Sequence, residues 1–584
     1  MPSEIGLGVP NDLRLPGVGT FPFKFGLQDL GGKAKNHGTT LYHLIKSCNF
    51  SNPWIILDCA SNGIPSLSLK KAYMRLTFLI LITLCLNAND ILGQNQITFK
   101  NPVEIVLNKH YSKELKEGSK IIISRIVGQR GTDGFISFSY IGVDSLGAEY
   151  YLKEILVKNA IYPLNPSVDQ VWEIGLIKNK VYEELLLNGY RFDIRKELNQ
   201  EATSFIKLLS ERDQFFNDAY LEDYLYRILH KIHKGYLTDG RPGNISIRVI
   251  KDATPNAMAL PNGCIILTTG LISCMNSESQ LIGVIAHEVA HFVNDHHILS
   301  YLKEQARQKR AEFWTGVVAG LAVATDAYLA SNNRNYSFGV LSNTAIVAAT
   351  LISEAVVKRM GINYSHDQEF SADILGKNVL NSLSLEEYAM AGALQLLKKH
   401  NYLSGDYSAI VGGETHPSIE NRIYALGGYY SDTVSSIKYD AEISFVNTYN
   451  AANLFYIKSD FMAALNLINR NITAKTGSAE DFLIKSRLIR RQGDTRESNV
   501  EALDLLNTSR QLMTEPSFWL EKDEALIQLR LNEKVKSVSC LNRYHESLKG
   551  ELPNSKQSIN FDYLDFLRKE ISWTVDMINK MESL

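Results

Sequence analysis

The sequence has few cysteines and no regular spacing among them. Its six cysteines form no Cys-x-x-Cys pair in 584 residues. That argues against a thiolate zinc site and against a disulfide framework. Cys264 and Cys274 flank an apolar, strand-like stretch. We expect two buried free thiols there rather than a disulfide bond.

The chain also lacks an excess of charge of either sign. It carries 61 basic and 63 acidic residues, for a formal net charge of −2, and no long basic run. Nucleic acids and anionic membranes select strongly positive surfaces, so no nucleic-acid partner is expected. The apolar content of 45% and charged content of 21% are those of an ordinary folded soluble protein, and the length allows three or four domains.

No apolar run is long enough to cross a bilayer comfortably. Leu76–Leu86 is apolar and follows the basic stretch Lys70–Arg75, which is the pattern of a secretory signal. We therefore predict a signal peptide over 74–94 and an exported protein, periplasmic or membrane-associated; a buried helix is the alternative. Signals begin chains and Met74 is a suitable start, so residues 1–73 are interpreted as a disordered or spurious upstream extension.

Two further apolar stretches, Phe313–Thr325 and Phe338–Ser353, contain no charged residue. Each is shorter than a comfortable membrane span. They predict an apolar helical hairpin over 313–353. It would pack on the protein or make a peripheral contact with a membrane surface.

The residue patterns predict an α+β fold that is mostly α. Residues 97–175 are read as a small β-rich accessory unit, with strands at Ile121–Val127 and Gly134–Ile141. Helical spacing over 218–232 follows, and then three short strands at 245–250, 256–260 and 263–269. The next helix is expected to begin at Asn276 or Ser277, with Gln280 as its capping-box partner.

The C-terminal region, 440–584, is predicted to be helical. Ala464-Leu465, Ala502-Leu503 and Cys540-Leu541 recur at a spacing of 38 residues. Such a period indicates stacked helix pairs of the tetratricopeptide kind, and an ordinary helical bundle is the alternative. A protein partner could bind there.

The most informative motif is His287-Glu288-Val289-Ala290-His291. On a helix, four residues advance about 400°, so the two histidines share one face and can bind one Zn²⁺. Glu288 lies about 100° round the helix, where its carboxylate can accept a proton from a water activated by the metal. Chance occurrence and a buried structural histidine pair are the alternatives.

A catalytic zinc site needs a third protein ligand. Glu369 and Asp373 are four residues apart and would share a helix face. Glu369 can ligate the metal, and Asp373 can accept the far N–H of a ligating imidazole. His366, one turn before Glu369, is a rival ligand, and two solvated acidic residues are the other alternative.

Four stretches together resemble metallopeptidase family 48, the gluzincins that include the CAAX prenyl protease, the HtpX proteases and the periplasmic barrel-assembly-enhancing protease. They match in order and spacing across roughly 215–430. The region before them resembles nothing we can name, and a repeat domain after them would resemble the periplasmic branch. The four stretches are Asn256–Gly263 leading to Thr268–Leu271, His287–His291 with His296 five residues on, Glu369–Gly376, and Thr415–Ile423.

The resemblance implies a zincin-like metalloprotease core over 178–430 and roles for single residues. His287, His291 and Glu369 would bind one zinc ion, and Glu288 would be the general base. Asp373 would orient a ligand, and Arg422 would be an electrostatic partner nearby. His416 would stabilise the oxyanion or gate the metal. The edge strand Asn256, Ala257, Met258, Ala259 and Leu260 would pair with an extended substrate backbone.

The expected function is therefore that of a zinc-dependent endopeptidase acting on extended or unfolded proteins, in extracytoplasmic protein quality control. The alternative is a latent peptidase that acts mainly as a chaperone-like binding module through its C-terminal helices. Metal content and chelator-sensitive cleavage of casein would separate the two.

Overall fold

The computed structural model describes residues 96–583 except 131–134, 236, 238–240, 242, 320–359, 405–416, 429–434, 515–516 and 553–560. Residues 95–584 belong to one compact unit. The predicted signal peptide, the upstream extension and most of the predicted apolar hairpin lie outside the described residues. Among the described helices, none is both long enough and apolar enough to cross a lipid bilayer.

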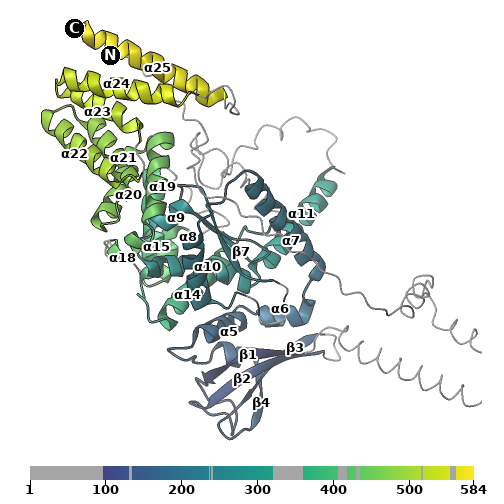
Figure 1. Cartoon of the computed structure of the whole chain (residues 1–584). Helices are drawn as coiled ribbons and strands as arrows, with labels where there is room; N and C mark the ends of the chain where they lie inside the picture. Colours follow the sequence, from purple (N-terminus) through teal and green to yellow (C-terminus); the bar gives the residue numbers. More distant parts are fainter. Residues whose placement is uncertain are drawn as a thin grey trace, which may run out of the picture. The chain divides into compact units, whose positions relative to one another are not determined.

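The first part of the described chain is an antiparallel sheet. Its four strands pair in the order β1-β2-β3-β4 and confirm the strands predicted near 121–127 and 134–141. Alternate side chains, such as Val103, Ile105 and Ile121, are fully buried on one face, which α5 and α6 cover (Figure 1). The bounds are β1 Gln96–Val106, β2 Lys120–Arg130, β3 Ile136–Val143, β4 Glu149–Lys153, α4 Glu154–Lys158, α5 Val168–Lys178, α6 Val181–Asn188 and α7 Phe192–Glu211.

The unit predicted as β-rich over 97–175 also contains the helix α4 and the start of α5, which begins at Val168. Ser167 and Gln170 form a reciprocal capping box that starts this helix. The hydrophobic core runs without a break from β1 through Trp172 of α5 to the helices of the central region. The domain boundaries stay predictions.

The central region contains a three-stranded sheet in the order β5-β7-β6, with β5 parallel and β6 antiparallel to β7. The three strands precede the buried helix α10 as predicted, but the unpredicted short helix α9 lies between β7 and α10. The bounds are α8 Ala219–Ile232, β5 Ser246–Ile250, β6 Ala257–Ala259, β7 Cys264–Thr268, α9 Thr269–Cys274, α10 Glu278–Val293, α11 His296–Ala319, α14 His366–Ser382, α15 Ala389–Ser404 and α17 Ile419–Ala425.

The start of α10 confirms half of the predicted capping box. Ser277 Oγ accepts the backbone N–H of Gln280. The Gln280 side chain, however, accepts the N–H of Asn276, 2.7 Å away, one residue earlier than a capping box requires. Both bonds fix the entry of the chain into α10.

Two glycines bring α10 and α14 close together. A Cβ on Gly376 would lie 3.0 Å from the carbonyl oxygen of Gly283 and 3.6 Å from the amide nitrogen of His287. The absence of a side chain at Gly376 therefore lets the backbone of α14 approach the turn of α10 that carries His287.

The rest of the chain is helical, as predicted, and each helix from α19 to α25 contacts the next (Figure 1). The 38-residue pattern falls on the buried faces of α20, α22 and α24, through Ala464, Ala502 and Cys540. A tetratricopeptide-like repeat stays a prediction. The bounds are α18 Ile437–Glu442, α19 Ser444–Asn453, η1 Leu454–Lys458, α20 Phe461–Thr473, α21 Ala479–Gln492, α22 Arg496–Leu512, α23 Trp519–Arg530, α24 Lys534–Gly550 and α25 Phe561–Glu582.

Candidate metal centre

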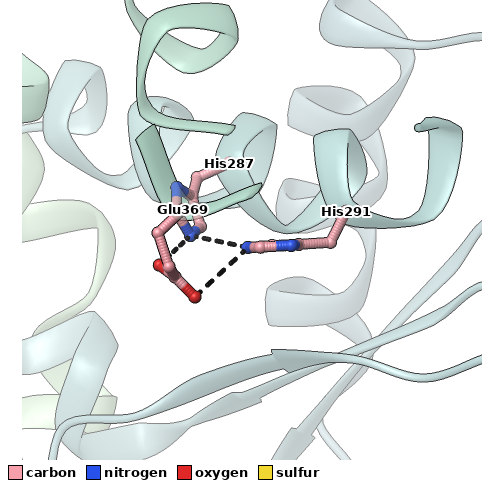
Figure 2. Close-up of side chains that lie close together, drawn as sticks. All are labelled: His287, His291 and Glu369. Carbon is pink, nitrogen blue, oxygen red and sulfur yellow. Dashed lines mark hydrogen bonds and ion pairs between the residues drawn. The ribbon is translucent and has the colours of Figure 1, made fainter. Parts of the chain in front are cut away.

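Three side chains from α10 and α14 converge on one point (Figure 2). His287 and His291, one turn apart on α10, place their Nε2 atoms 3.0 Å from each other. Glu369 of α14 places one carboxylate oxygen 3.6 Å from His287 Nε2 and the other 3.8 Å from His291 Nε2. All three residues are buried, with exposed fractions of 6%, 1% and 4%.

This donor set fits a zinc ion. A tetrahedral site with metal–ligand bonds of about 2.0–2.2 Å separates its ligand atoms by roughly 3.3–3.5 Å. The three separations, 3.0, 3.6 and 3.8 Å, bracket that range. Two imidazoles and one carboxylate are also the ligand types of a catalytic zinc site, which leaves a fourth position for water or substrate.

Behind the ligands, Asp373 and Arg422 form a charged pair. Asp373 Oδ1 lies 2.9 Å from His287 Nδ1, the ring nitrogen that faces away from Glu369. Burial opposes protonation of His287, but the nearby Asp373 carboxylate outweighs it, so the pKa of His287 is raised. Arg422 Nη1 lies 3.2 Å from Glu369 and holds that carboxylate as well.

His291 has different neighbours. Its Nδ1 lies 2.9 Å from Nδ1 of His296, the first residue of α11. Burial lowers the pKa of His296 to about 3, so its ring is neutral at pH 7 and can accept a hydrogen bond. The Tyr364 ring stacks on His291, with the ring centres 3.7 Å apart and the planes 12° apart.

Glu288 lies on the same helix but outside the ligand group. Its carboxylate is buried, and the backbone N–H of Ala259 in β6 favours its ionised form. Burial raises its pKa to about 7, against the opposing effects of His287 and of the Ala259 N–H. A buried carboxyl poised near neutral pH suits a group that takes up and releases a proton.

The predicted substrate strand lies beside the site. Ala257–Ala259 form β6, and no described strand pairs with its far side. Asn256 is exposed, Ala257 is half-buried, and Met258, Ala259 and Leu260 are buried. The strand thus passes from the surface inward toward Glu288.

Of the other predicted residues, Arg422 joins the site, but His416 lies outside the described residues. His366 is exposed on the first turn of α14 and does not join the three ligands, so the rival-ligand alternative was wrong. The sequence reading gave no role to Tyr364 or His297, and it named His296 without one. The adjacent histidines His296 and His297, which begin five residues after His291, were the sequence signal that could have pointed to these contacts.

Comparison with known proteins finds a family similar to the region that carries this site. Residues 221–429 match the model of peptidase family M48. The beta-barrel assembly-enhancing protease of Escherichia coli (strain K12) is 28% identical over 237 residues, 40% of this chain and 44% of that protein. A protease HtpX homolog of Caldanaerobacter subterraneus subsp. tengcongensis is 25% identical over 230 residues, 34% of this chain and 71% of that protein.

The matched region spans less than half the length of the beta-barrel assembly-enhancing protease. It contains every described residue of the metal centre. Residues 221–429 are therefore the part of the chain that is similar to peptidase family M48.

Proposed function

We propose that this protein is a zinc-dependent endopeptidase that hydrolyses peptide bonds of extended or unfolded proteins. One observation carries the proposal: two imidazoles and a carboxylate converge at 3.0–3.8 Å, with the separate carboxylate of Glu288 beside them. The three converging side chains would hold the metal, and the carboxylate of Glu288 is left free to transfer protons.

The residues divide the chemistry among them. His287, His291 and Glu369 would hold a zinc ion, which would supply a Lewis acid for a water molecule and for the substrate carbonyl. Glu288 accepts the proton of the attacking water and passes it to the leaving amine. Asp373 fixes the ring of His287, and Arg422 balances the charge of the two carboxylates on α14.

The edge strand β6 supports the proposed substrate class, and the sequence supports the proposed location of the protein. A substrate that pairs with the edge of β6 must be extended, which favours unfolded chains. The signal-like stretch Lys70–Leu86 supports an exported protein, periplasmic or membrane-associated. Relatives named beta-barrel assembly-enhancing proteases support a role in extracytoplasmic quality control, with the C-terminal helices as a partner surface.

The direct test is Glu288→Gln. We expect the variant to bind one zinc per chain but to lose cleavage of casein by at least about 1,000-fold, because the proton acceptor is gone. Glu278→Gln is the matched control, since Glu278 begins the same helix and its side chain is 40% exposed. A zinc-loaded Glu288→Gln protein that still cleaves casein would refute the assignment.

A latent peptidase is the second candidate. Its support is the burial of the site, where Glu288 is only 8% exposed and the three ligand residues less. Zinc bound stoichiometrically by the wild-type protein without chelator-sensitive cleavage of casein would favour this candidate. Absence of bound zinc would contradict both.

A further inference from the structure

The hydrogen-bonding groups of β6 point alternately toward β7 and away from it. The Asn256 carbonyl accepts the N–H of Thr268, and the Leu260 N–H bonds to the carbonyl of Cys264. In an antiparallel pair the bonded positions alternate, so Asn256, Met258 and Leu260 face β7. Ala257 and Ala259 therefore direct their N–H and C=O groups to the far side of the strand.

At Ala259 the outward carbonyl already has a partner. Its oxygen lies 2.9 Å from Nε2 of His297. A carbonyl can only accept, so Nε2 of His297 carries the hydrogen and donates it. His297 is buried, and Ala259 has no exposed surface.

Tyr364 holds His297 in this position. Its hydroxyl oxygen lies 2.9 Å from the same Nε2, and the two rings meet edge to face at 5.6 Å and 88°. The Tyr364 ring is itself stacked on His291. The carbonyl of Ala259 is thus tied, through two side chains, to a residue of the metal centre.

We propose that His297, held by Tyr364, occupies the Ala259 carbonyl with its hydrogen bond. Backbone pairing of the substrate is thereby limited to Ala257. The inference rests on the proposed function. His297 acts as a positioning residue: it sets the register in which an extended substrate lies along β6, and it does so without touching the substrate. One substrate N–H then bonds to the strand, at the Ala257 carbonyl, and none bonds to Ala259.

The test is an N-methyl scan of a peptide that the zinc-loaded wild-type protein cleaves once. Each peptide of the set carries one methylated amide, and kcat/KM is measured for each. With the wild-type protein, methylation at one amide other than the scissile amide should lower kcat/KM about tenfold. The reason is that the methyl group removes one backbone hydrogen bond and adds a steric penalty. In His297→Leu the Ala259 carbonyl is released, and a second sensitive amide should appear two residues from the first.

Two further variants separate positioning from folding. His297→Gln supplies an N–H donor and should restore the single sensitive amide. Tyr364→Phe keeps the stacked ring and removes a hydroxyl oxygen that shares the single Nε2–H of His297 with the Ala259 carbonyl, so it should keep the single sensitive amide. Zinc content is measured throughout, because a merely structural role would lower cleavage of every peptide alike and leave the sensitive positions unchanged.

The wild-type scan alone can overturn the proposal. Two sensitive amides two residues apart in the wild-type protein would show that the substrate uses the Ala259 carbonyl. An unchanged pattern in a zinc-loaded His297→Leu protein would overturn it equally. In both cases zinc-dependent cleavage persists, whereas failure of the proposed function is seen as no cleavage by any zinc-loaded form.

Discussion

Arg422 binds the carboxylate of Asp373 through two hydrogen bonds, of 2.8 Å from Nε and 2.6 Å from Nη2. Although burial would raise it, Arg422 keeps the pKa of the Asp373 carboxyl lowered, with help from His287. Asp373 is therefore ionised beside His287 Nδ1, and an ionised partner favours an N–H at Nδ1 and a free lone pair at Nε2, the atom that faces the metal position.

Asp373→Asn should weaken zinc binding at pH 7.5 by roughly 10- to 100-fold. It should also change the pH dependence of zinc affinity. In wild type the pKa of His287 is raised, so protons compete with zinc at a higher pH than for an ordinary histidine. Without the carboxylate that pKa falls, and the loss of affinity on acidification moves to lower pH.

Competition with a chromophoric chelator between pH 5.5 and 8 measures both effects. Asp367→Asn is the control, because Asp367 is exposed on the first turn of the same helix. An Asp373→Asn protein with wild-type zinc affinity throughout that pH range would show that Asp373 does not orient His287.

Gly376→Ala should loosen the metal centre without touching a ligand. The new Cβ would lie 3.0 Å from the Gly283 carbonyl oxygen, so α14 must move away from α10 and take Glu369 with it. We expect about 1–3 kcal/mol of lost stability and weaker zinc binding. Urea unfolding and zinc titration measure the two effects.

The control is Gly550→Ala, where a Cβ would meet no atom within 4 Å. It should leave zinc affinity unchanged and should not lower stability, because alanine favours a helix more than glycine does. Unchanged stability and zinc affinity in Gly376→Ala would show that α10 and α14 can accommodate the added methyl group without moving apart.

Local spacing predicted the parts of this site that lie within one helix. His287 and His291 share a face of α10, and Glu369 and Asp373 share a face of α14, because four residues make about one turn. Even the 38-residue recurrence found one equivalent buried position on each of α20, α22 and α24.

Contacts between distant segments could not be read from spacing. Tyr364 and His297 are 67 residues apart, and they meet because α11 and the start of α14 pack beside the same strand end. Nothing periodic marks Tyr364, and a tyrosine before a helix is ordinarily read as core. The helix α5 was missed for another reason: its capping box at Ser167 was present in the sequence but lay in a stretch dominated by strand patterns.

Arg470→Ala should destabilise the peptidase core, although Arg470 belongs to α20. Its guanidinium donates to the carbonyls of Ser273 and Met275 at the end of α9, and it pairs with the buried Asp440. Removing it leaves Asp440 without that partner and uncaps the helix just before α10. The cost should be about 3 kcal/mol.

Hydrogen exchange of the α10 amides locates the effect of Arg470→Ala. They should exchange faster than in wild type, whereas Arg496→Ala, at an exposed position on α22, should leave them unchanged. Faster exchange confined to α18–α25 would contradict the coupling between the C-terminal helices and α10.

Removal of zinc should lower the thermal midpoint of the wild-type protein, and returning zinc should restore it. A ligand that binds only the folded chain stabilises it by about 2.7 kcal/mol at a free concentration 100 times its Kd. Glu288→Gln should respond to zinc like wild type, because Glu288 lies outside the ligand group, whereas Glu369→Gln should respond much less. Each variant loses one carboxylate from the same buried site, but only the Glu369 carboxylate faces the two Nε2 atoms. Equal responses of the two variants to zinc would therefore mean that zinc binds elsewhere.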